Sequence, residues 1–118
     1  MTTSTTSDIR QLRKAIQTRD AAGVLAWYRE DAVITLVDRD HPPTSPTTFS
    51  GTAEISAYYT DICGRNIDHQ VDQLVHDETG LAYVQLCRYP DGGKVTCATV
   101  ASLTAGRIAR QTIVQAWD

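Results

Sequence analysis

The spacing of hydrophobic residues changes along the chain, from a helical period near its start to a period of two in its second half. Leu12 and Ile16 lie on one side of a helix, which predicts a helix over residues 8–19. Asp20 is placed to cap a second, short helix, whose apolar positions continue to Tyr28. The start of the chain is therefore predicted to be helical.

Residues 52–63 return to the helical period, and Gly64 follows where a left-handed cap commonly ends a helix. Residues 32–37 are a β-branched run typical of a strand, and three prolines in residues 38–46 predict a loop. A short extended segment follows that loop. Alternating runs then predict further strands, at residues 68–76, 81–89, 94–103 and 106–118.

This order of elements predicts an α+β fold. Helices segregated from a four-strand antiparallel meander pack on one face of the sheet, and a curved sheet leaves a mouth in which a pocket forms. Residues 106–118 form the last strand, which we expect in the middle of the sheet because a chain end at an edge frays. We expect one domain over residues 8–118 and a disordered tail over residues 1–7.

Composition and charge exclude several classes of protein. The 118 residues are 42% hydrophobic and 21% charged, which suits a globular domain. A net charge of −3, without a run of basic residues, predicts no nucleic-acid partner. No apolar stretch approaches the ~20 residues that span a bilayer, and the start of the chain lacks a signal-peptide pattern. We therefore expect a cytoplasmic protein without a membrane partner.

The cysteines and histidines show no metal-binding pattern. Cys63, Cys87 and Cys97 form no CxxC pair, and the three histidines lack HExxH spacing. We expect reduced thiols, no metal and no cofactor. Cys87 and Cys97 are interpreted first as small buried hydrophobes, because the sequence shows no electropositive partner for either.

Four short motifs follow one another along nearly the whole chain, namely Asp20–Val33 with its Trp27–Tyr28 pair, Phe49–Tyr59, His69–Val71 and Gly106–Ile108. Together they resemble the nuclear transport factor 2-like superfamily, in its SnoaL-like and ketosteroid-isomerase-like branch. The resemblance implies a cone-shaped, curved antiparallel sheet packed on three N-terminal helices. It does not fix an activity, because this fold hosts isomerases, dehydratases, cyclases, hydrolases and binding modules.

The resemblance supplies no complete catalytic set. Ketosteroid isomerases use a carboxylate base, a tyrosine and a protonated acid, and steroid isomerisation by that set is not expected here. Their positions fall on Leu36, Leu12 and near Thr99.

Three other residues are candidates for acid–base catalysis. His69 matches the catalytic histidine at the start of the meander in scytalone-dehydratase-like members, and histidine serves as acid or base at its ordinary pKa. Asp38 shares a face with Leu36, and Asp118 is the only carboxylate of the last strand, where SnoaL-like cyclases place an acid or base. The alternatives are a structural histidine and solvated loop or terminal acids.

Polar and aromatic residues on inward-facing positions are candidates for ligand binding. Tyrosine hydroxyls lining a cavity hold ligand oxygens, whereas aromatic residues otherwise belong to the core. A bulge would reverse the facing of the two glutamines in the last strand, so the sequence leaves their direction open. The candidates are Trp27, Tyr28, Tyr58, Tyr83, Cys87, Thr99, Gln111 and Gln115.

The opposite face of the meander is also apolar, at Ala82, Val84, Leu86, Ala98 and Val100. This pattern predicts a homodimer through the sheet, or else scattered apolar surface. The function we expect is cofactor-free isomerisation, cyclisation or dehydration of a small apolar or aromatic, oxygenated, polyketide-like molecule. The alternative is a non-catalytic ligand-binding or dimerisation module of the same fold.

Overall fold

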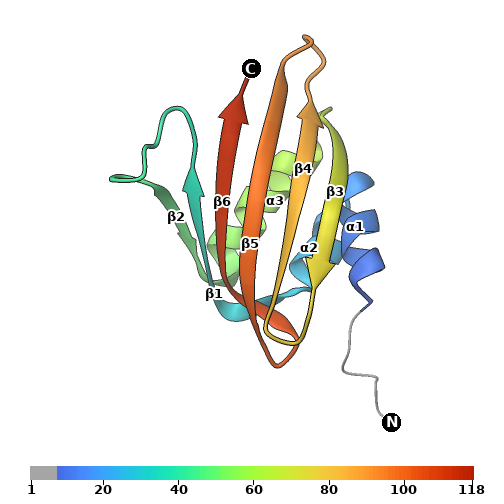
Figure 1. Ribbon diagram of the computed structural model, residues 1–118, viewed down its shortest axis with the longest axis vertical. Helices are drawn as coiled ribbons and strands as arrows, with labels where there is room; N and C mark the ends of the chain where they lie inside the picture. The colour runs from blue at the N-terminus through green and yellow to red at the C-terminus, as the bar shows by residue number, and fades with distance from the viewer. Residues whose placement is uncertain (1–7) are drawn as a thin grey trace.

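The computed structural model describes residues 8–118, so the expectation for residues 1–7 lies outside the described residues. Residues 8–118 form a curved, unclosed sheet of six strands with three helices on one face (Figure 1). The predicted α+β class is confirmed. The helices are α1 (Ile9–Gln17), α2 (Ala21–Leu25) and α3 (Gly51–Gly64). The strands are β1 (Tyr28–Val37), β2 (Thr47–Ser50), β3 (Asp68–His76), β4 (Gly80–Arg88), β5 (Lys94–Thr104) and β6 (Arg107–Trp117).

The first two helices begin at aspartate caps, as the sequence predicts. The Asp8 carboxylate accepts the Arg10 N–H at 3.0 Å, and the Asp20 carboxylate accepts the Gly23 N–H at 3.1 Å. Each bond satisfies an amide that the first helical turn leaves without a partner.

The sequence reading is wrong at the ends of α2 and α3. The helix after Asp20 ends at Leu25, and Tyr28 already belongs to β1, because Ile108 donates its N–H to the Trp27 carbonyl at 2.7 Å. Gly64 is helical rather than left-handed, and the chain leaves α3 through extended backbone at Arg65.

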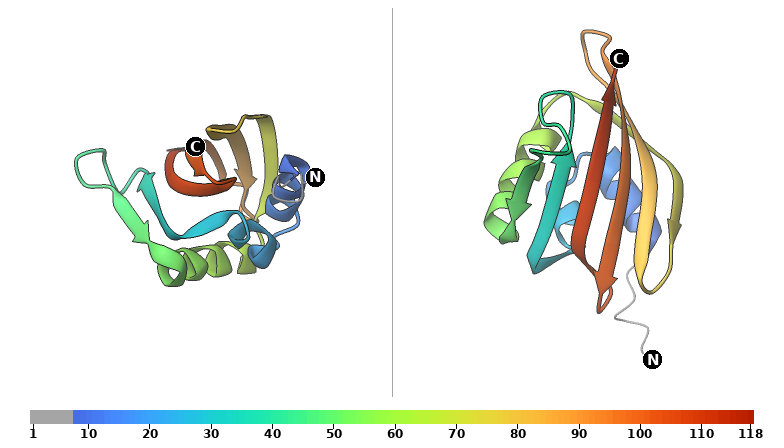
Figure 2. Two further views of the ribbon diagram at one scale, coloured as in Figure 1. Left: turned by 90° about the horizontal axis from the view of Figure 1, so that it is seen from below. Right: turned by 60° about the vertical axis from the view of Figure 1, so that its left-hand side comes forward.

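β6 lies inside the sheet, which confirms the expectation for the last strand. The strand order is β2-β1-β6-β5-β4-β3, so β6 pairs parallel with β1 on one side and antiparallel with β5 on the other. The expected meander from β3 to β6 is confirmed. Figure 2 shows the resulting curvature, with α3 beneath β1 and β2 and with α1 beside β3.

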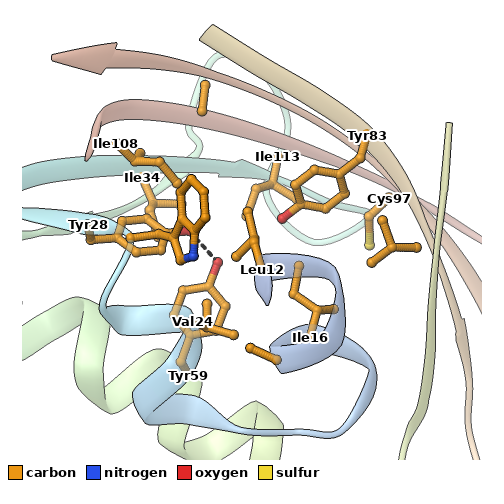
Figure 3. Close-up of a cluster of buried hydrophobic side chains, with 14 of the residues drawn as sticks. Leu12, Ile16, Val24, Tyr28, Ile34, Tyr59, Tyr83, Cys97, Ile108 and Ile113 are labelled. Carbon is orange, nitrogen blue, oxygen red and sulfur yellow. Dashed lines mark hydrogen bonds between the residues drawn. The ribbon is translucent and has the colours of Figure 1, made fainter. Parts of the chain in front are cut away.

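The core fills the space between the helices and the inner face of the sheet. Leu12, Ile34, Ile55 and Ile108 are almost completely buried there, and Figure 3 shows residues of several elements meeting in this layer. The helices within residues 8–118 are too short or too polar to cross a membrane.

The structure shows which side chains of β6 point into the interior. Gln111 and Ile113 are buried and Gln115 is half-buried, whereas the residues between them are exposed. The register irregularity with β5 lies between Ser102 and Leu103, near the start of β6, so it leaves this alternation intact. Both glutamines therefore point toward the helices.

Candidate functional site

A small cavity opens between α3 and the inner face of the sheet. Its volume is about 70 Å³, and strands β3 to β6 supply one wall. The lining combines aromatic, apolar and polar side chains, as ligand sites do. They are Tyr58, Tyr59, Ile62, Arg65, Ile67, His69, Tyr83, Gln85, Cys87, Tyr89, Cys97, Ile113 and Gln115.

The structure brings five of the sequence candidates together in this lining and separates the others from it. Those in the lining are His69, Tyr58, Tyr83, Cys87 and Gln115. Four lie in the buried interior but do not line the cavity, namely Trp27, Tyr28, Thr99 and Gln111. Asp38 and Asp118 lie at the ends of their strands, outside the lining.

His69 is the central polar group of the cavity. It lies on β3 and is only 5% exposed. Its Nδ1 accepts the Gln85 side-chain N–H at 2.9 Å, which places the ring proton on Nε2. That Nε2 has no hydrogen-bond partner among residues 8–118. Because a buried donor without a partner costs about 1–3 kcal/mol, the site favours a ligand that accepts this proton.

A chain of hydroxyl and amide groups lies beside the cavity. The Tyr28 and Tyr59 hydroxyls are 2.6 Å apart, and Tyr28 donates its hydroxyl to the Gln111 carbonyl oxygen. Burial raises the pKa of Tyr28, Tyr59 and Tyr58 and brings that of Tyr83 to about 12. These tyrosines stay neutral and hold polar groups rather than act as bases.

The Cys87 and Cys97 thiols hydrogen-bond to each other across the neighbouring strands β4 and β5. Cys87 Sγ lies 3.4 Å from His69 Nδ1. Hydrogen bonding with Cys97 outweighs burial and lowers the pKa of Cys87. The same interaction, together with burial, raises the pKa of Cys97. The sequence predicts that both cysteines are small buried hydrophobes, and that prediction does not account for the polar contacts of Cys87.

The outer rim of the cavity is aromatic. Tyr89 lies in the lining, and its ring centroid is 5.7 Å from that of Trp117. The Arg39 guanidinium lies 4.3 Å above the Trp117 ring and holds it by a cation–π contact. Arg65 lines the cavity from the segment after α3.

The carboxylate of Asp38 is engaged locally. It contacts the His41 ring nitrogen and the Asp40 N–H, both at 2.9 Å. Burial acts to raise the pKa of Asp38, but these two hydrogen bonds outweigh it and the pKa is lowered. Asp118 is exposed and donates its backbone N–H to the Lys94 carbonyl. Catalytic roles for both acids stay predictions, and neither carboxylate lines the cavity.

Several lining residues were missed at the sequence level. Gln85 alternates with Tyr83 and Cys87 on β4, and Tyr89 continues the alternation just after the strand, so the period of two carried a signal for both. Arg65 had no such signal, because it follows a helix in an irregular segment. Within the described part of the chain, no group of three or more His, Cys, Asp or Glu side chains is placed to hold a metal ion.

Comparisons with known proteins identify the fold and one family. The sequence model of the SnoaL-like domain family matches residues 9–111 of this chain. No curated protein matches the chain. A nuclear transport factor 2-like protein of unknown function from Mesorhizobium loti is 15% identical, with a TM-score of 0.79 over 92% of this chain and 87% of that one.

Two further solved structures show the same fold. A protein from Kribbella flavida, provisionally described as a ketosteroid isomerase, is 17% identical, with a TM-score of 0.72 over 93% of this chain and 74% of its own. A protein of unknown function from Burkholderia xenovorans is 14% identical, with a TM-score of 0.74 over 93% and 79%. At these identities the similarity establishes the curved sheet and the helices that cover it.

Proposed function

Because the chain belongs to the SnoaL-like domain family, we propose that it binds a small oxygenated molecule in this cavity and that His69 transfers a proton to that molecule. The observation that carries the proposal is that His69 lines the cavity and that its buried Nε2–H has no hydrogen-bond partner among residues 8–118. Histidine is the side chain best suited to this work near neutral pH.

The neighbouring groups define what His69 does. Gln85 occupies Nδ1 of the ring, which leaves Nε2–H as the nitrogen that can donate to a ligand. As Nε2 gives its proton to the carbonyl oxygen, a water molecule takes a proton from the adjacent carbon, which forms the enol, and that water then returns a proton to Nε2. Enolisation is a step shared by isomerisation, cyclisation and dehydration of carbonyl compounds. We therefore propose that the reaction of this protein is one of these three types.

The size of the cavity limits the ligand. About 70 Å³ is well below the roughly 300–1,000 Å³ of sites that enclose drug-sized ligands. We propose that a carbonyl-bearing arm enters the cavity, while an apolar or aromatic ring, such as that of a polyketide-like molecule, packs on Tyr89 and Trp117 at the rim. Free thiols at Cys87 and Cys97 suit a reducing, cytoplasmic setting for this chemistry.

Exchange of the methyl hydrogens of acetone in deuterated water tests the proposal, because acetone is a small carbonyl compound. We expect the protein to accelerate the loss of the methyl proton NMR signal, and His69→Gln to slow this exchange at least about tenfold. Glutamine keeps a hydrogen-bonding group but cannot transfer a proton. The matched control is His76→Gln, an exposed histidine on the same strand, which should leave the rate unchanged.

Two outcomes would redirect the proposal. If acetone shifts the NMR signals of cavity residues but exchanges no faster than in buffer, the protein is a binding module without catalysis. The small cavity and the lack of a carboxylate in its lining favour that alternative. If acetone neither binds nor exchanges, a role of this cavity in handling small carbonyl compounds is wrong.

The outer face of the sheet supports the proposed homodimer. Proteins of this fold bind small ligands and often form dimers. Val100 is 63% exposed on β5, and Val114 and Leu86 are exposed on the adjacent strands. An apolar, exposed surface over neighbouring strands is a common site of subunit contact.

Sedimentation equilibrium tests the dimer. We expect the wild-type chain to have twice the monomer mass and Val100→Lys to have the monomer mass, because a buried, unpaired charge at the interface is costly. Gln11→Lys, on the exposed side of α1, adds the same charge away from the sheet and should stay dimeric. A wild-type monomer would exclude the interface.

A further inference from the structure

The thiol of Cys87 has an unusually polar environment for a buried cysteine. It is 8% exposed and lies on the cavity wall. Its Sγ is 3.4 Å from Nδ1 of His69 and 3.7 Å from the side-chain nitrogen of Gln85, and the Cys97 thiol approaches it from β5. A cysteine that only fills space needs none of these contacts, whereas a nucleophilic thiolate is stabilised by the hydrogen bonds of the Gln85 amide and the Cys97 thiol.

We propose that Cys87 is a nucleophile that forms a thioether with small α,β-unsaturated carbonyl compounds entering the cavity, with His69 giving a proton to the carbonyl oxygen of the ligand. Two observations converge on this site. The sulfur and its donors line one side of the cavity, and the Nε2–H of His69, buried and without a partner within residues 8–118, is available to the ligand's carbonyl oxygen. The inference goes beyond enolisation, because a covalent bond to the protein forms and no turnover is required.

The addition balances without any other reactant. The sulfur forms a bond to the β-carbon of the ligand, and the π electrons of the carbon–carbon double bond move toward the carbonyl group. The thiol proton passes to water when the thiolate forms, and Nε2 of His69 gives its proton to the carbonyl oxygen and regains one from water. The resulting enol reverts to the ketone, so that S–H has added across the double bond. Nothing is oxidised or reduced overall.

The cysteines of the chain differ in how their pKa values are shifted. Hydrogen bonding with Cys97 lowers the pKa of Cys87 against the effect of burial, whereas burial raises the pKa of Cys63. Cys63 is the more accessible of the two. If exposure alone determined reactivity, Cys63 would react faster. The proposal predicts that Cys87 reacts faster. The titratable groups that face Cys87 are Tyr58, Arg65, His69, Tyr83, Tyr89 and Cys97.

Labelling of the full chain with methyl vinyl ketone tests the proposal. The protein is treated anaerobically with an equimolar amount of the reagent, and adducts are located by peptide mass spectrometry. We expect Cys87 to react at least about tenfold faster than Cys63. The Cys87 rate should persist to lower pH than the Cys63 rate, because the pKa of Cys87 is lowered and that of Cys63 is raised. Equal or faster labelling of Cys63 would overturn the proposal.

Variants separate the roles of the neighbours. Cys87→Ser should abolish the fast adduct, His69→Gln should slow it at least about tenfold, and His76→Gln should leave it unchanged. Cys97→Ala should slow labelling and Cys97→Ser, which keeps a donor, should preserve it. Because His69→Gln could fail to fold, circular dichroism is recorded for each variant, and the wild-type pH profile tests the proposal by itself.

The two functional proposals fail independently. Acetone lacks a carbon–carbon double bond, so its exchange reports on His69 without any thioether. If Cys87 forms the adduct but the protein does not accelerate acetone exchange, the proposal for Cys87 is supported and the proposed enolisation activity is wrong.

Discussion

Trp27→Ala is expected to lower the free energy of unfolding by about 4 kcal/mol. The Trp27 side chain is 6% exposed and belongs to the core, and its backbone carbonyl joins the start of β1 to β6. Removing a buried indole leaves a cavity that the surrounding helix and strands cannot close. A typical domain is stable by only about 5–15 kcal/mol, so the variant should unfold at much lower urea, as followed by circular dichroism.

The second tryptophan provides a matched control. Trp117 is 36% exposed and contacts Tyr89 and Arg39 at the rim. Trp117→Ala should cost only about 1 kcal/mol, because it removes surface contacts and creates no internal cavity. Equal losses in the two variants would contradict the assignment of Trp27 to the core and Trp117 to the rim. This contrast also separates a structural role of Trp27 from the ligand-binding role that its sequence context predicts.

Gly80→Ala is expected to lower the free energy of unfolding by about 2 kcal/mol. A Cβ atom at Gly80 would lie 2.8 Å from the Ala101 carbonyl oxygen on the paired strand β5. Because that oxygen belongs to the backbone, β4 and β5 must separate locally to accept a methyl group. The midpoint of urea unfolding measures the loss.

Substitution of Gly64 by alanine should change the free energy of unfolding in the opposite direction. No atom lies within 4 Å of a Cβ at this position, and the residue is helical. Alanine in a helix is favoured over glycine by roughly 0.5–1 kcal/mol, so Gly64→Ala should stabilise the protein slightly. Destabilisation would instead fit the left-handed cap that the sequence predicts at this residue.

Local signals were sufficient for most of the fold. Asp8 and Asp20 cap their helices through bonds to residues two or three positions away, so the chain's own spacing contains the information. The β3 to β6 meander follows from turns and alternation in the same way. At Tyr28 the helical pattern continues, but pairing with Ile108 determines the structure, and that partner lies far along the chain.

The candidate site depends on contacts that no local pattern encodes. The sequence placed His69 at the start of a strand and Cys87 on an inward face, and both line the cavity. It did not reveal that these two side chains meet, nor that Gln85 occupies Nδ1, because β3–β4 register sets both contacts. Asp38 shows the converse, since its strand position suggests a base while its nearest partners are His41 and Asp40.

The parallel pairing of β1 with β6 has a consequence for biosynthesis. Leu36 pairs with Ile113, which the ribosome adds 77 residues later. At a synthesis rate of about 5–20 residues per second, one edge of β1 stays unpaired for roughly 4–15 s before β6 is made. An apolar strand with an open edge can pair with another nascent chain during that interval. A chaperone that covers β1 until β6 emerges would therefore raise the yield of folded protein.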